Sequence, residues 1–121
     1  MDNKNLERRP EKIRTEQQFQ ELREILSKAI KFSSGWKNIL SNINPEHITN
    51  KKSLEKIPIT RKSSLSLLQK NNSPLGGLSI IPINKFKNLF VSPGPIYEPG
   101  GCEDFWRMSR AMNAASFSKG D

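Results

Sequence analysis

Three prolines lie close together in "LFVSPGPIYEPGG", residues 89–101, and they limit what the chain can form there. The preceding "FKNLFVS", residues 86–92, is rich in β-favouring side chains and stops at Pro93, so it predicts a strand followed by a turn. Turns after strands in α/β proteins often bind phosphate through backbone N–H groups, and proline has none. Whether this turn binds a ligand or is a rigid structural turn is left open by these residues.

The turn is predicted to lead into a last helix, over residues 103–115. Glu103 and Asp104 suit its first turn because carboxylates interact favourably with a helix N-terminus. Its apolar face comprises Phe105, Met108, Met112 and Ala115. A strand followed by a helix normally leads to a parallel neighbouring strand. We therefore expect an α/β chain that is truncated, the first part of a larger protein.

The clearest helix is predicted over residues 15–31. Thr15 and Gln18 have the spacing of a capping box, and Gly35 is predicted to end the helix in a left-handed conformation. Its apolar face comprises Phe19, Leu22, Leu26, Ala29 and Ile30. A shorter second helix, which the residue before Pro45 should stop, has an apolar face of Trp36, Ile39, Leu40 and Ile43.

Shorter elements are predicted between these helices and the proline turn. Ser53 can cap one helical turn that ends at Pro58, and Thr60 can cap the next helix, with Leu65 and Leu68 facing inward. Residues 71–84 are rich in turn-forming residues and predict an irregular segment with a short strand at 78–81.

The composition favours one small domain with a thin core. The chain has 121 residues, 34% of them hydrophobic and 7% aromatic, which is below the usual apolar share. No apolar run reaches the roughly 20 residues of a membrane span, and the polar start has no secretory h-region. A cytoplasmic location without membrane contact is therefore expected. Cys102 is the only cysteine, so no internal disulfide can form, and with His47 it cannot assemble a zinc site.

The net charge of +8 is concentrated in the first part of the chain. Residues 1–70 carry 15 basic and 8 acidic side chains, whereas residues 71–121 carry 5 and 4. A basic region can indicate nucleic acid or another anionic ligand. Here the charges spread along helices with no interleaved aromatic residues, which favours an ordinary solvated surface. His47 is interpreted as a surface or capping histidine, Arg61 and Lys62 as solvent-facing, and Cys102 as an ordinary residue.

Several phrases, in order, resemble the N-terminal portion of the phenylacetate–CoA ligase family, a branch of the AMP-forming acyl-CoA synthetases. They are "ERRPEK", "SSGWKNIL", "NPEHITNKKSLEKIPITRKSSL" and "AASFSKGD". The third is the most similar, with Lys56 where the family usually has an apolar residue, and in the last Ser116 replaces a glycine. The family pattern is matched by Ser53, Leu54, Ile57, Pro58, Thr60, Lys62 and Leu65.

The resemblance implies both a fold and an activity. Residues 1–14 would be a polar lead-in, and residues 15–121 would supply the helical start and first strand–turn–helix of the large adenylate-forming domain. In the complete protein, Mg²⁺-ATP would activate a carboxylic acid, such as an aryl acetate, as its adenylate with release of pyrophosphate, and coenzyme A would then accept the acyl group. The catalytic pocket would lie beyond residue 121, so the chain alone is expected to bind no cofactor and to supply no catalytic or metal-ligating residue.

The proline turn falls where this family carries its phosphate-binding loop, "S-S-G-T-T-G-x-P". Ser92, Gly94 and Pro99 match that loop, while Tyr97 replaces a glycine and Glu98 stands where lysine is common. The cofactor-binding candidates are therefore Ser92, Gly94, Tyr97 and Glu98. Since a phosphate cradle needs converging N–H groups and positive charge, we expect weak nucleotide binding here.

A second interpretation fits the same residues. The chain could be a complete small basic protein, mainly helical, that binds nucleic acid or a protein partner. A steep loss of affinity with salt would identify a nucleic-acid binder.

Overall fold

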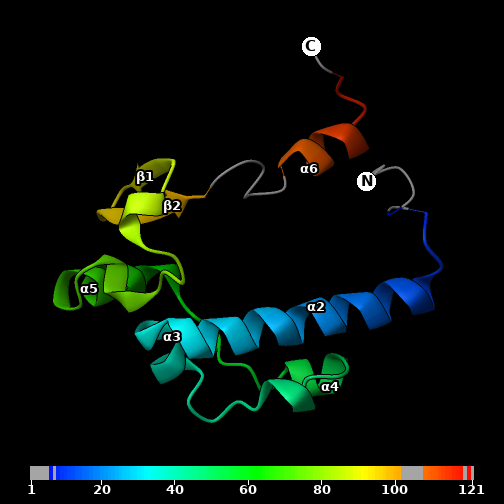
Figure 1. Ribbon diagram of the computed structural model, residues 1–121, viewed down its shortest axis with the longest axis horizontal. Helices are drawn as coiled ribbons and strands as arrows, with labels where there is room; N and C mark the ends of the chain where they lie inside the picture. The colour runs from blue at the N-terminus through cyan, green and yellow to red at the C-terminus, as the bar shows by residue number, and fades with distance from the viewer. Residues whose placement is uncertain (1–5, 7, 102–107, 119, 121) are drawn as a thin grey trace.

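The computed structural model describes residues 6, 8–101, 108–118 and 120, and within them the protein is helical first and then forms a β-hairpin (Figure 1). This is a mixed α/β arrangement. The α-helices are α2 (Glu11–Phe32), α3 (Ser34–Ile39), α4 (Lys51–Leu54), α5 (Lys62–Asn71) and α6 (Met108–Ala114). The strands are β1 (Asn88–Ser92) and β2 (Ile96–Gly100), and single 3₁₀ turns occupy Pro45–His47, Leu75–Gly77 and Ile83–Lys85.

Helix α2 begins at Glu11, four residues before the predicted start, so the capping box proposed for Thr15 and Gln18 is wrong. Pro10 occupies the N-cap with φ of −50° and makes no side-chain cap bond. Residues 11–14, Glu-Lys-Ile-Arg, are compatible with a helix and simply continue it upstream. Part of the predicted polar lead-in therefore belongs to α2.

A serine, not Gly35, ends α2. Ser33 adopts an extended conformation, and its hydroxyl accepts a hydrogen bond from the Trp36 N–H at 3.1 Å, which caps α3. The buried Ser33 hydroxyl also donates to the Gly77 carbonyl at 2.6 Å. Gly35 serves close packing, because a Cβ atom there would lie 2.6 Å from the Gly76 carbonyl oxygen. The prediction of a left-handed Gly35 is wrong.

The caps of the two following helices also differ from those predicted. Asn50 caps α4 by accepting from the Ser53 N–H at 2.9 Å, and the Ser53 hydroxyl in turn accepts from the Asn50 N–H at 3.0 Å. Ser53 is thus the third residue of a capping box and not the N-cap. Arg61, not Thr60, occupies the N-cap of α5 and makes no side-chain cap bond.

A small apolar core lies between α2, α3 and the segment before α4. Leu26, Leu40 and Ile48 are buried together, with Ile48 only 2% exposed. Partly buried side chains surround them, namely Phe19, Leu22, Ile30, Trp36, Ile39, Ile43 and Ile57. The helical periodicity of residues 19–30 and 36–43 therefore identified most of this core.

The strand predicted over residues 86–92 is confirmed as β1, and a second strand that was not predicted follows it ahead of the last helix. β2 pairs antiparallel with β1 in the register Asn88↔Gly100 to Ser92↔Ile96, with Pro93, Gly94 and Pro95 as the turn. Leu78–Ile81 is not a strand, because the Ser79 hydroxyl bonds both backbone groups of Ile81 in a local turn. The predicted strand–turn–helix therefore contains an additional strand, β2, between the turn and α6.

Pro99 fits inside β2 because of the alternation of hydrogen bonds along an antiparallel pair. Tyr97 directs its N–H and its carbonyl to Gln69 of α5 and hence away from β1. Pro99, two residues on, shares that outward orientation, so its missing N–H lies on the outer side of β2. The ladder between the two strands loses no bond, which is the situation in which strands tolerate proline.

Helix α6 covers the second part of the helix predicted at residues 103–115. Its predicted start, with Glu103, Asp104 and Phe105, lies outside the described residues, as does Cys102. No helix within the described ranges combines the length and the apolar character needed to cross a bilayer.

Candidate functional site

The proline turn is attached to α5 by one polar stripe of that helix. Lys62, Ser66 and Gln69 follow the i, i+4, i+7 spacing that places side chains on one helical face. Each of the three bonds to a different residue of the segment 94–98. We call Lys62, Ser66 and Gln69 the α5 stripe.

Gln69 makes the most complete of these contacts. Its Nε2 donates to the Tyr97 carbonyl at 2.8 Å, and its Oε1 accepts from the Tyr97 N–H at 2.9 Å. The side-chain amide thereby bonds both outward backbone groups of Tyr97 on the β2 edge, as a neighbouring strand would. The Tyr97 N–H is consequently committed to protein structure.

The tip of the turn is held by Ser66 and shaped by glycine. The Ser66 hydroxyl donates to the Gly94 carbonyl at 3.1 Å. Gly94 has φ of +150°, a conformation that favours glycine, and a Cβ there would lie 3.0 Å from Cγ1 of Ile96. The Ser92 hydroxyl reaches the Ile96 carbonyl at 3.5 Å, at the far limit of a hydrogen bond.

Glu98 and Lys62 form an ion pair between β2 and the first turn of α5. Nζ of Lys62 lies 3.4 Å from both carboxylate oxygens of Glu98, and the side chains are 57% and 38% exposed. Exposed pairs of this kind contribute about 0.2–1 kcal/mol. The expectation that Lys62 is solvent-facing is thus met only in part, because its ammonium group also partners Glu98.

The four candidate residues lie in one hairpin, yet their geometry does not fit a triphosphate. A phosphate cradle needs several N–H groups that converge on one point. Pro93 and Pro95 have none, Gln69 already holds that of Tyr97, and Glu98 adds negative charge beside the turn. In this geometry the segment serves as a structural turn anchored to α5.

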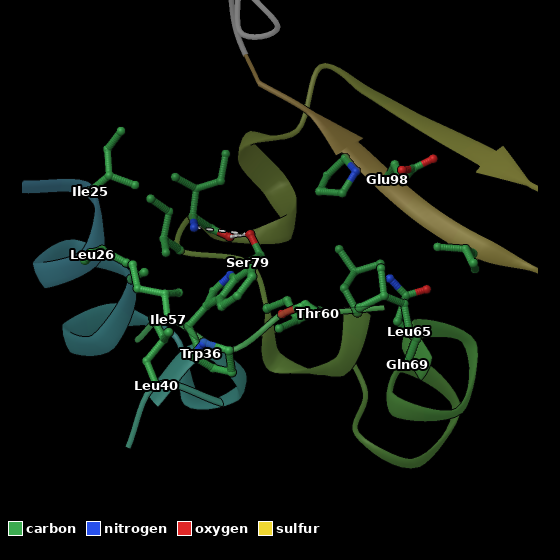
Figure 2. Close-up of a pocket in the computed structure, with 18 of the residues that line it drawn as sticks. Ile25, Leu26, Trp36, Leu40, Ile57, Thr60, Leu65, Gln69, Ser79 and Glu98 are labelled. Atoms are coloured by element: carbon green, nitrogen blue, oxygen red, sulfur yellow. Dashed lines mark hydrogen bonds between the residues drawn. The ribbon is translucent and has the colours of Figure 1, made fainter. Parts of the chain in front are cut away.

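An open apolar groove of about 710 Å³ runs between the helical core and the hairpin. Figure 2 shows Ile25 and Leu26 of α2 on one side, Leu65 and Gln69 of α5 on the other, and Glu98 where β2 closes the end. The volume lies in the range of small-molecule sites. The sequence reading missed this groove, because its walls come from segments far apart in the chain.

The groove can bind apolar groups, but few of its lining side chains could react with them. Its polar lining consists of Thr60, Gln69, Ser79, Tyr97 and Glu98. Ser79 is bonded to Ile81, Gln69 to Tyr97, and Glu98 to Lys62. No nucleophile paired with a base faces the groove within the described residues.

His47 stands apart from both places. His47 is exposed in the 3₁₀ turn Pro45–His47, and Cys102 lies outside the described residues. Among the residues that the structure describes, no three His, Cys, Asp or Glu side chains gather as a metal ion would require.

Sequence reasoning missed Ser66 and Gln69 as partners of the turn. Part of the signal was present, since polar residues at 62, 66 and 69 recur at the spacing of one helical face beside Leu65 and Leu68. What the sequence could not provide was the segment that this stripe contacts.

Comparison with known proteins adds no relative: no family model, curated protein or solved structure matches the chain.

Proposed function

We propose that these residues are the N-terminal part of a phenylacetate–CoA ligase-like, AMP-forming acyl-CoA synthetase. The complete enzyme would convert a carboxylic acid, such as an aryl acetate, with ATP and coenzyme A to the acyl-CoA thioester, AMP and pyrophosphate. The proposal begins from the order and spacing of the phrases that resemble this family. The mixed α/β fold is compatible with it.

One structural observation supports the proposal most. Residues 53–65 lie in the segment of strongest resemblance, and residues 92–99 stand where the family carries its phosphate-binding loop but depart from its pattern. The two segments are far apart in the sequence and contact each other. Lys62 of the first pairs with Glu98 of the second at 3.4 Å, and Ser66, just beyond the first, bonds Gly94 at 3.1 Å. Motif segments that come together in a fold are typical of a shared site.

In this proposal the described residues hold the turn in place and carry out no chemical step. The α5 stripe holds the turn beside the groove, and the turn offers few free N–H groups to ATP. A carboxylate about 4 Å from a phosphate oxygen costs about 1 kcal/mol in water, and Lys62 offsets part of that cost. We therefore infer that nucleotide affinity depends little on this turn, and that the groups binding Mg²⁺, adenine and coenzyme A lie elsewhere in the complete enzyme.

The test is an assay of the complete enzyme with Mg²⁺-ATP, coenzyme A and a panel of aryl acetates. We expect release of pyrophosphate that requires the acid, together with formation of AMP and a thioester. Glu98→Lys should lower the KM for ATP several-fold, because it replaces a repulsive charge by an attractive one. Glu98→Gln is the matched control and should give a smaller decrease.

Two results would contradict the proposal. If no acid in the panel causes pyrophosphate release, the proposed ligase activity is wrong. Binding of the chain to nucleic acid, with an affinity that falls steeply as salt rises, would favour the second interpretation. If ATP binding is already tight and Glu98→Lys weakens it, the inference about the turn is wrong while the activity stands.

A further inference from the structure

We draw no further inference here: the strongest candidate, the open apolar groove between α2, α5 and β2, is an unpartnered apolar surface, and nothing in the structure shows what covers it.

Discussion

The two halves of this molecule are stabilised in different ways. In the helical half, Leu26, Leu40 and Ile48 exclude water together, and the helices carry side-chain caps at Ser33 and Asn50. In the hairpin half, three consecutive apolar residues of β1 are at least half exposed, and the α5 stripe supplies the polar contacts that fix the turn. A two-stranded hairpin is only marginally stable in water without support. The first half therefore makes its own core, whereas the second is held to α5 by polar anchors.

The largest effect should come from the core of the helical half. Ile48→Ala removes a side chain that is 2% exposed and should lower the free energy of unfolding by about 2–5 kcal/mol. Ile59→Ala is the matched control, because Ile59 is 88% exposed, and it should cost less than about 0.5 kcal/mol. Denaturant unfolding followed by circular dichroism measures both. Equal losses for the two variants would mean that the helical half has no core of its own.

A smaller effect should follow from breaking the anchor of the hairpin. Gln69→Ala leaves the N–H and carbonyl of Tyr97 to solvent and should cost about 1–2 kcal/mol, as two ordinary hydrogen bonds would. The loss should be local, seen as faster hydrogen exchange at Tyr97 with little change around Leu26. Gln20→Ala removes a glutamine with one long contact to Glu24 and serves as the control. Unchanged exchange at Tyr97 would contradict the role given to Gln69.

The sequence predicted the helical half better than the hairpin half, for a physical reason. A helix has 3.6 residues per turn, so the residues of its buried face recur every three or four positions. The spacing of Leu22, Leu26 and Ile30 therefore predicts their burial from a short window of sequence. The strand at 88–92 was also visible. Its partner was not, because "IYEPGG" contains a proline and glycines that weaken any strand signal.

Helix boundaries were predicted less well than helix positions. Pro10, Ser33 and Asn50 set the ends of α2 and α4 in place of Thr15, Gly35 and Ser53. Several residues in each region could act as a cap, and the choice depends on contacts such as that of Ser33 with Gly77. The same limit applies to the candidate site. Ser92, Gly94, Tyr97 and Glu98 were named from the sequence, but the contacts of Ser66 and Gln69, the Lys62–Glu98 pair and the groove required the fold.

Native-state hydrogen exchange tests the difference between the halves most directly. The amides around Leu26 in α2 should exchange only through global unfolding, with the highest free energy of opening in the chain. The amides of Phe90 and Glu98, which face one another across the hairpin, should open at a free energy lower by at least about 1 kcal/mol, with Gln69→Ala widening the gap. Equal protection of both regions would contradict the account, because it would show that the hairpin belongs to one cooperative core with the helices.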